Sequence, residues 1–541
     1  MTRLALLGLC WIGCDGEAPV DDSGPIDVTD TGCAEAPTWY ADSDGDGFGD
    51  PGTARAACVG DAGEVLQAGD CDDADPGVHP DATDVPLDGR DQDCDGADAA
   101  LADCARRVLQ VGDVRLTSLE DEQALCAAAN AVEGSVTVEG HPGAGLIALA
   151  CLCEVTGDLI VTGNPALEAL DGGALQALGG AFAVSENPAL VAVAGLPPAG
   201  FAGAVTVSGN AALTTLAPLP AALDALTLTD NDHLTDLDAF AAVEAVAGDL
   251  RVRGNPALTQ VAFPALATVD GALTVGDNGA LVALSFPDLT AVTGVLTLSA
   301  GAGLTDASWP QLARVGGLSV TGTGLSTLGL GALTRITADL TLAGTALTAL
   351  GTPRLNVVGG SVDLEGNTRL ADLTGLDDVT SVDTLRVVGN GGLTSLAGLD
   401  HLSGIQGEWI LMDNPGLADL SGLGALSSVS GDIYLLRNAN LASLSGLGPL
   451  TTAGSDLVIQ ENDALVALDG LSALSLVDRD LAIVGNDALI DVTGLHDVGW
   501  VGGDLEVRQN GALPDAAAQA LVDAIGEGNV FGVILLEDNG G

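Results

Sequence analysis

The chain has 541 residues, of which 75 are acidic and 16 basic, and its formal net charge is −59 at pH 7. A chain of this length forms several domains or one elongated repeat array, because single hydrophobic cores stop growing well below it. All the basic residues are arginine, and the absence of lysine excludes P-loop nucleotide binding and Schiff-base catalysis. The excess of negative charge disfavours nucleic acid and anionic lipid as partners. Aromatic residues make up only 3% of the chain, so its core must be built from small aliphatic side chains.

The first residues have the features of an export signal. Arg3 is followed by the apolar run 4–12 and then by Gly13 and Cys14. This run is too short to span a bilayer as a helix, which needs about 20 residues, so we expect residues 1–13 to be a signal peptide. The letters WIGC at 11–14 resemble a bacterial lipobox, which implies lipidation of Cys14. The alternative is ordinary secretion with cleavage nearby. A flexible linker is expected over 14–36.

Cysteine usage agrees with export. Apart from Cys10 and Cys14, the cysteines are Cys33, Cys58, Cys71, Cys94, Cys104, Cys126, Cys151 and Cys153. An even number in an exported chain favours disulfides, although the sequence leaves the pairing open. Zinc is disfavoured, because there is no C-x-x-C and the histidines are scattered.

Between residues 37 and 100 the aspartates are spaced as cation ligands. DSDGDGFGD at 42–50 places carboxylates at alternate positions, and GDCDDAD at 69–75 and DQDCDGAD at 91–98 follow. Calcium takes oxygen ligands, and D-x-D-x-D-G wraps a short loop around one ion. The first loop is not an EF-hand, because its twelfth position is Thr53 rather than Glu. The candidate metal ligands are Asp42, Asp44, Asp46, Asp50, Asp70, Asp72, Asp73, Asp75, Asp91, Asp93, Asp95 and Asp98.

These three clusters, in this order and with Cys71 and Cys94 embedded, resemble a metal-binding motif of exported bacterial proteins that is related in style to thrombospondin type 3 calcium repeats. The resemblance covers about residues 37–98 and implies bound Ca2+. Some members of that family are associated with copper, for which His79 and Trp39 are the soft candidates; the hard carboxylates favour calcium. The alternative is a polyacidic linker without ordered metal.

From residue 134 onward the sequence is one long repeat. GDLIVTGNPAL at 157–167 recurs as GDLRVRGNPAL at 248–258 and as GDIYLLRNANL at 431–441. One position of the repeat, which we call the Asn column, recurs every 21 to 24 residues. Its members are His141, Asn164, Asn187, Asn210, Asn231, Asn255, Asn278, Gly301, Thr323, Thr345, Asn367, Asn390, Asn414, Asn438, Asn462, Asn486 and Asn510. Such a period predicts stacked coils that bury their apolar faces against one another.

Within a coil, Leu159 and Val161 alternate with Ile160, which is typical of a strand with one buried face. Asn164 follows at the corner, where its side chain can bond the backbone of neighbouring coils. The fold is therefore predicted to be mainly β: a single right-handed parallel β-solenoid of about 17 coils with helical caps, preceded by a small calcium-loop module.

Both ends of the repeat are expected to be capped. SLED at 118–121, followed by alanines, predicts a helix that begins after Ser118. At the other end, 514–525 has a helical pattern and GVILLEDN at 532–539 predicts a last strand. The expected domains are the Asp-rich module 37–100, an N-terminal cap 101–133, the solenoid 134–513 and a C-terminal helix and strand cap 514–541.

The repeat resembles the receptor L-domain family, a leucine-rich-repeat-like β-solenoid found in growth-factor receptors and microbial surface proteins. The resemblance spans about residues 112–541 and departs from ordinary leucine-rich repeats in the two residues between Asn164 and Leu167. It implies extracellular recognition or surface organisation without catalysis, and it carries over no ligand.

Outward-facing strand residues suggest where a partner binds. They are mainly small and polar over the middle coils, where Arg251 and Arg253 interrupt them, and apolar over five later coils. The proposed strip consists of Arg386, Val388, Ile410, Met412, Tyr434, Leu436, Arg437, Val458 and Val484. Contiguous exposed apolar surface usually marks a contact site, here for an extracellular protein or glycan. The alternative is β-propensity on a surface partly covered by loops.

The leading function is a non-catalytic, calcium-binding lipoprotein of a bacterial outer membrane or cell surface, which acts in adhesion, recognition or envelope organisation. One alternative is a polysaccharide-cleaving enzyme, for which Asp363 and Glu365 are the nearest approach to a carboxylate pair. Another is metal or copper capture by the Asp-rich module.

Overall fold

The computed structural model describes residues 36–82, 91–96 and 104–540, except 147, 173, 196–200, 300, 302 and 323. They form two compact units, the Asp-rich module (36–82 and 91–96) and the solenoid (104–540). The expected signal peptide, the lipidation site Cys14 and the candidate ligand Asp98 lie outside the described residues. None of the helices in the described ranges is long and apolar enough to cross a membrane.

The Asp-rich module is built on a small antiparallel sheet. Strand β1 (Thr38–Ala41) pairs with β2 (Arg55–Ala56) and β3 (Glu64–Val65), and the 3-10 helix η1 (Pro51–Thr53) follows the first Asp loop. Trp39 donates its indole N–H to the carbonyl of Ala57 at 3.0 Å, and Cys71 is disulfide-bonded to Cys94. Among the described residues of this unit, Ala57 and Val78 are the only fully buried apolar ones. Hydrophobic burial alone is therefore too small to stabilise the module.

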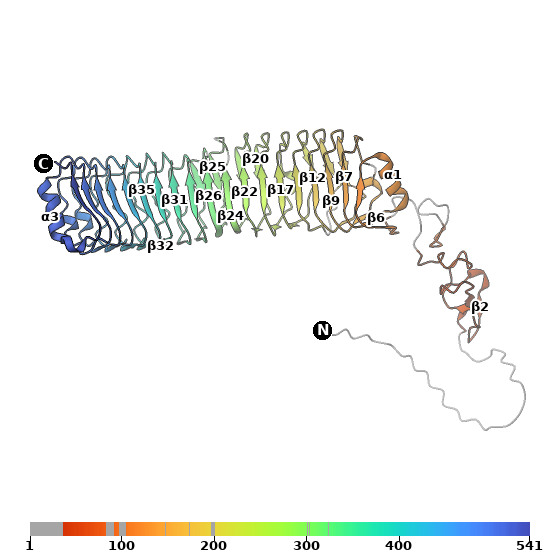
Figure 1. Ribbon diagram of the computed structural model, residues 1–541. Coiled ribbons are helices and arrows are strands. Elements are labelled where there is room, and N and C mark those ends of the chain that lie inside the picture. The colour runs from red at the N-terminus through yellow and green to blue at the C-terminus, as the bar shows by residue number, and fades with distance from the viewer. Residues whose placement is uncertain are drawn as a thin grey trace, which may run out of the picture. The chain divides into compact units, whose positions relative to one another are not determined.

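The solenoid is a stack of parallel coils, each contributing one strand to a continuous ladder (Figure 1). The strands of this ladder are β5 (Val114–Leu116), β7 (Val136–Glu139), β9 (Leu159–Thr162), β12 (Phe182–Ser185), β14 (Val205–Ser208), β17 (Leu226–Thr229), β19 (Leu250–Arg253), β22 (Leu273–Gly276), β24 (Ala291–Ser299), β26 (Arg314–Thr321), β29 (Leu340–Ala343), β31 (Val362–Glu365), β33 (Leu385–Val388), β35 (Trp409–Met412), β37 (Ile433–Leu436), β39 (Leu457–Gln460), β41 (Leu481–Val484), β42 (Leu505–Arg508) and β43 (Ile534–Glu537). The predicted mainly β, parallel solenoid of about 17 coils is confirmed.

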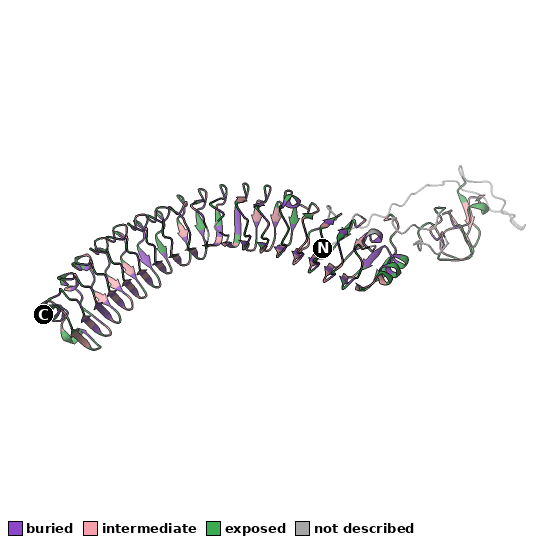
Figure 2. Ribbon diagram, turned by 90° about the horizontal axis from the view of Figure 1, so that it is seen from above, coloured by how far each residue is buried: buried purple, intermediate pink, exposed green. Residues whose placement is uncertain are grey.

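Shorter strands line the other sides of the coils. One side carries β4 (Leu109–Val111), β6 (Ala131–Glu133), β8 (Glu154–Val155), β11 (Ala177–Leu178), β16 (Ala222–Leu223), β18 (Ala245–Val246), β21 (Thr268–Val269), β28 (Arg335–Ile336), β30 (Val357–Val358), β32 (Ser381–Val382), β34 (Gly404–Ile405), β36 (Ser428–Val429), β38 (Thr452–Ala453) and β40 (Leu476–Val477). The return side carries β10 (Ala169–Asp171), β13 (Ala192–Ala194), β15 (Thr215–Leu216), β20 (Gln260–Ala262), β23 (Ala283–Ser285), β25 (Asp306–Ser308) and β27 (Thr327–Gly329), and the 3-10 turns η2 (Asp238–Phe240), η3 (Asp469–Leu471) and η4 (Thr493–Leu495) complete three of the coils. The stack of coils curves along its length (Figure 2).

The Asn column forms a buried hydrogen-bonded ladder. The backbone N–H of Asn414 donates to the side-chain oxygen of Asn438 at 3.0 Å, and the Asn414 side-chain amide donates to the carbonyl of Val387 at 2.9 Å. The same contacts repeat from coil to coil, and Asn539 continues them beyond Asn510. The asparagines of the column are at most 1% exposed, so each one satisfies corner amides that would otherwise be buried without a partner.

In the described coils, the residue before the corner has a left-handed backbone. It is glycine in many coils, as at Gly254 (φ 67°), but Asp413 (φ 58°), Arg437 (φ 54°) and Glu461 (φ 55°) adopt the same conformation. A side chain in this region is strained, so the stacking of the coils must hold it there.

The interior is a single core of leucine and valine that runs the length of the stack. Inward residues such as Leu411 and Leu435 are fully buried, and outward residues of the same strands are half-buried (Figure 2). Aromatic rings follow one another along one interior column: Phe240 is tilted against Phe263, and Phe263, Phe286 and Trp309 are stacked. Because each coil is covered by its neighbours, the small aliphatic side chains bury nearly all of their surface.

Both predicted caps are present. Helix α1 (Leu119–Ala128) begins after Ser118, whose hydroxyl accepts from the backbone N–H of Asp121, and Cys126 bonds to Cys151 in the short helix α2 (Ala148–Cys151). Cys104 bonds to Cys153. Helix α3 (Asp515–Ile525) and η5 (Glu527–Asn529) precede the last strand, as predicted.

Candidate metal centre and partner surface

The first Asp loop turns its own backbone amides onto its carboxylates. Asp42 accepts from the N–H groups of Gly45 at 2.6 Å and Gly47 at 3.2 Å. Asp44 and Asp46 each accept from the N–H two residues later, at 3.2 and 2.8 Å. These bonds use the Oδ1 atoms of Asp44 and Asp46. They also fix the direction in which the Oδ2 atom of each carboxylate points.

The second Asp cluster closes over this loop. Asp73 accepts from both the backbone N–H and the hydroxyl of Ser43, at 2.9 and 2.6 Å. This contact brings carboxylate oxygens of Asp44, Asp46 and Asp70 within 4.8 Å of one another, and those of Asp42, Asp44 and Asp73 likewise. Two neighbouring groups of three oxygens therefore share Asp44.

Three of these oxygens are buried without a hydrogen-bond partner: Oδ2 of Asp44, of Asp46 and of Asp70. Burial raises the pKa of the Asp70 carboxyl, and repulsion from neighbouring carboxylates adds to the rise; the same two causes raise the pKa of Asp44. Buried carboxylates without partners are costly unless a cation pairs with them. The group formed by Asp44, Asp46 and Asp70 thus fits a hard metal ion on the chemistry of its donors.

A third loop repeats the construction of the first. Asp91 accepts from the N–H groups of Asp95 at 3.0 Å and Gly96 at 2.7 Å, and Asp91, Asp93 and Asp95 bring ligand oxygens within 4.8 Å of one another. Both loops have the pattern D-x-D-x-D-G. In both, the glycine amide bonds the first aspartate, so the local sequence sets the local geometry.

Three of the proposed ligands lie outside these groups. Asp50 caps η1 by accepting from the N–H of Gly52 at 2.7 Å, and Asp75 accepts from the N–H of Gly77 at 3.2 Å. Asp72 also belongs to none of the groups of three found among the described residues. The spacing of aspartates in the sequence does not distinguish these three from the aspartates that form the groups of three, because turn capping uses the same short side chains.

The soft candidates for copper are placed differently. The Trp39 indole is bonded to Ala57, and the His79 ring stacks on Phe48 with centroids 5.1 Å apart. His79 is in none of the groups of three, although its Nδ1 is buried without a hydrogen-bond partner. The assembled donors are therefore all carboxylate oxygens, which hard cations prefer.

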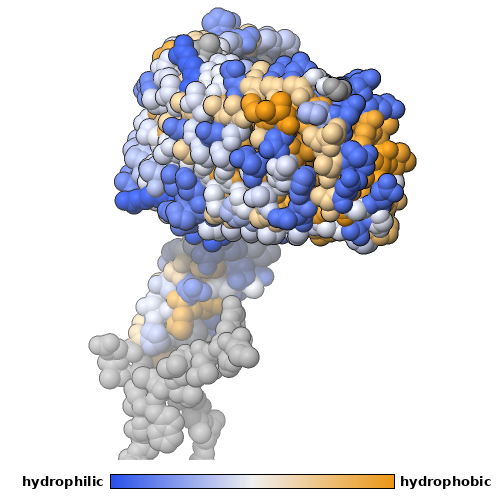
Figure 3. Space-filling model, turned by 90° about the vertical axis from the view of Figure 1, so that its left-hand side faces the viewer, coloured by the Kyte–Doolittle hydropathy of each residue, from blue (hydrophilic) through white to orange (hydrophobic). Residues whose placement is uncertain are grey.

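The apolar strip on the later coils is present in register. Ile410, Tyr434 and Val458 are paired neighbours on β35, β37 and β39, and Met412 lies beside Leu436. All five are half-buried and face outward. Val388 and Val484 are nearly covered, at 7% and 6% exposed, so they add little to the surface. Viewed from the C-terminal end, the solenoid shows apolar side chains gathered on one side (Figure 3).

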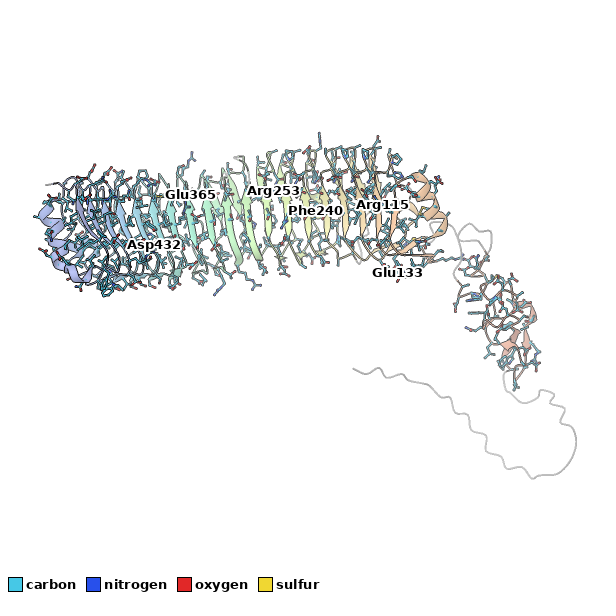
Figure 4. All side chains as sticks on the ribbon, in the orientation of Figure 1. Arg115, Glu133, Phe240, Arg253, Glu365 and Asp432 are labelled. Atoms are coloured by element: carbon cyan, nitrogen blue, oxygen red, sulfur yellow. A yellow bond between two sulfur atoms is a disulfide. The ribbon has the colours of Figure 1, made fainter. Side chains whose placement is uncertain are left out.

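The arginines beside the strip are paired with carboxylates. Arg437 binds Asp413 through two bonds of 2.8 Å, and Arg508 pairs with Glu506. Arg386 bridges Asp363 at 2.8 Å and Glu365 at 2.6 Å. Glu365 lies on the strand face (Figure 4). The arginine fringe expected from the sequence is thus neutralised, and the carboxylate pair considered for catalysis shares one guanidinium.

A second surface feature lies on the middle coils. Arg251 and Arg253 line a shallow groove of about 700 Å³ with Thr227, Thr229 and Thr274. Arg253 (Figure 4) pairs with Asp277 at 2.6 Å and Arg251 pairs with Asp249 at 2.8 Å. These arginines too are balanced by carboxylates.

Comparison with known proteins supports metal binding by the Asp-rich module. Residues 70–99 match a family described as "Putative metal-binding motif". No curated protein matches the chain. A solved leucine-rich repeat protein from Bacteroides ovatus ATCC 8483 is 10% identical over 70% of this chain and 84% of its own, with a TM-score of 0.18. The fold is therefore assigned from the chain's own coils: this is a parallel β-solenoid protein with an Asp-rich motif similar to that metal-binding family.

Proposed function

We propose that this chain is a non-catalytic recognition protein of a bacterial cell envelope, whose Asp-rich module is held in shape by Ca2+. The observation that carries the metal part is the set of three unpartnered, buried carboxylate oxygens on Asp44, Asp46 and Asp70. Calcium is favoured over copper because every donor in the assembled groups is a hard oxygen.

Calcium binding by the full mature chain tests this proposal. Asp44 belongs to two groups of ligands, so Asp44→Asn should weaken binding by at least about tenfold or abolish it at those groups. Asp50→Asn is the matched control, because Asp50 caps a turn and should leave the calcium titration unchanged. Equal calcium binding by wild type and Asp44→Asn would contradict the assignment.

Metal analysis of the exported protein separates calcium from copper capture. Calcium without copper supports a structural ion. Stoichiometric copper that disappears in His79→Ala would replace the proposal with metal capture, since His79 Nδ1 is a soft donor that is buried without a hydrogen-bond partner.

The solenoid is proposed to act in adhesion, recognition or envelope organisation through its outward strand face. In support, the half-buried strip around Tyr434 and Met412 is contiguous over adjacent coils, and the Asp363 and Glu365 carboxylates are held by Arg386 rather than poised as an acid and base pair. Hydrolysis of acidic or neutral glycans by the purified protein would contradict the non-catalytic part.

The proposed tether is a lipid on Cys14. It is supported by the apolar run before Gly13 and Cys14. Cys14→Ser should move the protein from the membrane fraction to the soluble fraction of the envelope. Unchanged membrane association would reject the lipid anchor.

A further inference from the structure

The apolar strip is bordered on one side by a row of acidic residues. The residue immediately before each of the strands β35, β37, β39, β41 and β42 is acidic. We call these residues the acidic edge: Glu408, Asp432, Asp456, Asp480 and Asp504. They follow one another on successive coils along the same side of the strip.

Hydrogen bonds between coils fix this edge. Oδ1 of Asp432 accepts the backbone N–H of Asp456 at 3.0 Å, Oδ1 of Asp456 accepts that of Asp480 at 3.1 Å, and Oδ1 of Asp480 accepts that of Asp504 at 2.8 Å. The carboxylates are therefore held one coil apart, about 4.8 Å, as a rigid row of like charge.

Little positive charge offsets this row. Among the described residues, Arg479 is the one cation within ion-pair distance of the edge, 3.7 Å from Asp456. On the opposite side of the strip, Arg437 is neutralised by Asp413, and Glu461 follows on the next coil. The apolar strip thus lies between two borders whose net charge is negative.

We propose that this strip binds a cationic amphipathic helix of a partner protein, laid along the stack of coils. The proposal rests on the recognition role and names the partner's chemistry. The helix would place apolar side chains on Ile410, Met412, Tyr434, Leu436 and Val458, and basic side chains against the acidic edge.

The repeat distances agree with this orientation. One coil advances about 4.8 Å and one helical turn about 5.4 Å, so successive turns meet successive coils. From β35 to β42 the acidic edge spans four coil steps, about 19 Å, which corresponds to about 13 residues of helix. The half-buried apolar residues lie on the first three of these coils, β35, β37 and β39, and meet about two turns of that helix.

A second copy of the chain does not fit the same surface. The chain carries a net charge of −59, and α3, its longest helix among the described residues, contains Asp515 and Asp523 and no basic residue. Like charges on the two surfaces would repel.

Synthetic 14-residue helical peptides provide the test, titrated into the full mature chain at saturating calcium. One peptide has a leucine face flanked by lysines, and its partner has glutamates in place of the lysines. The lysine peptide should bind, and its affinity should fall by about tenfold or more between 50 and 500 mM NaCl, because the pairs at the border are exposed to screening. The glutamate peptide should not bind.

Two sets of variants locate the site. The first set is a triple variant that combines Asp432→Asn, Asp456→Asn and Asp480→Asn. It keeps the side-chain oxygens that accept the backbone N–H groups but removes the charges, and it should lower the affinity for the lysine peptide by about tenfold or more. Tyr434→Ser with Met412→Ser should abolish its binding. The matched controls are Asp158→Asn, which caps Ala181 in the same way at 2.7 Å, and Ile160→Ser, an outward residue of β9. Both controls should bind as wild type does.

Several results would overturn the proposal. They are equal binding of the two peptides, binding unaffected by the combined Asp variants, or no binding of either peptide at millimolar concentration. Capture of a glycan, or self-association lost in Tyr434→Ser, would assign the strip to another occupant. The calcium titration is independent of all these outcomes, so failure here leaves the metal proposal standing.

Discussion

The Asp-rich module and the solenoid satisfy their turn amides with different side chains. In the module, carboxylates such as Asp42 accept the amides of their own loop, and in the solenoid the neutral amides of the Asn column accept those of the next coil. A neutral amide can be buried when its hydrogen bonds are complete, whereas a buried carboxylate also requires a counter-charge. The buried carboxylates of the module therefore call for a cation, whereas the Asn column is satisfied by the solenoid's own backbone and side chains.

The two regions also differ in what holds them together. The module buries little apolar surface and relies on Cys71–Cys94 and on contacts between its loops. The solenoid has a continuous core, and its disulfides are confined to the first coils. Stability in the stack is the sum of contacts between neighbours, so damage to one coil should be local but costly.

The largest expected effect is the loss of one asparagine from the ladder. Asn438→Ala removes the acceptor of two buried N–H groups of Asn414, at 3.0 and 3.2 Å, and also removes the amide that donates to the Leu411 carbonyl. We expect a loss of at least about 3 kcal/mol of unfolding free energy. Urea unfolding followed by tryptophan fluorescence measures it. Asn356→Ala, at an exposed position, should change stability by less than about 0.5 kcal/mol; equal effects would show that the ladder is not stabilising.

Calcium should stabilise the module and leave the solenoid unchanged. At free calcium about a hundred times its dissociation constant, the module should gain about 2.7 kcal/mol. Addition of a chelator should then speed proteolytic cleavage within residues 36–96, with no change in the thermal midpoint of the solenoid. A solenoid midpoint that moves with calcium would contradict the independence of the two regions.

Completing the Asn ladder should stabilise the stack. The column is interrupted after Asn278, and at Thr345 the hydroxyl donates to Asn367 at 2.6 Å in place of an amide. Thr345→Asn would add the missing bond to the preceding coil and should raise stability by about 1 kcal/mol. Thr341→Asn, at an outward position of β29, is the control and should give no gain. A destabilised Thr345→Asn would mean that packing at this corner outweighs the bond.

The smallest effect concerns ionisation at the strip. Burial, together with the hydrogen bond that Tyr434 donates to Asp432 at 3.1 Å, raises the pKa of the Tyr434 phenol to about 12. In a Tyr40→Phe background, Tyr434 is the only tyrosine, and its ultraviolet titration should have its midpoint near that value. Asp432→Asn should lower the midpoint, since a neutral amide no longer opposes phenolate formation. An unchanged midpoint would show that Asp432 does not contribute.

Local signals in the sequence predicted much of this molecule. The period of the Asn column and the alternation of Leu159, Ile160 and Val161 predicted the coils, since both patterns concern neighbours along the chain or one repeat away. The continuation of the ladder to Asn539 and the left-handed residues before the corners were missed. In the second case, Asp413 and Arg437 have no glycine signal, and their conformation is imposed by stacking.

The selection among candidate ligands could not be predicted. Asp50 and Asp46 have similar spacing in the sequence, but only the contact between Asp73 and Ser43 decides which carboxylates meet. The role of Arg437 was likewise missed, because its partner Asp413 is 24 residues earlier and becomes its neighbour only when the coils stack.

The sequence by itself determined the architecture of this protein, because a repeat that buries its apolar face only against copies of itself specifies a stack. It also determined that the module would present carboxylates in short glycine-rich loops. Only the tertiary structure decided which oxygens converge, which arginines are neutralised and how the acidic residues before successive strands line up beside the apolar strip. Those outcomes depend on distances between side chains on different coils or loops, and electrostatic interaction is set by separation in space rather than along the chain.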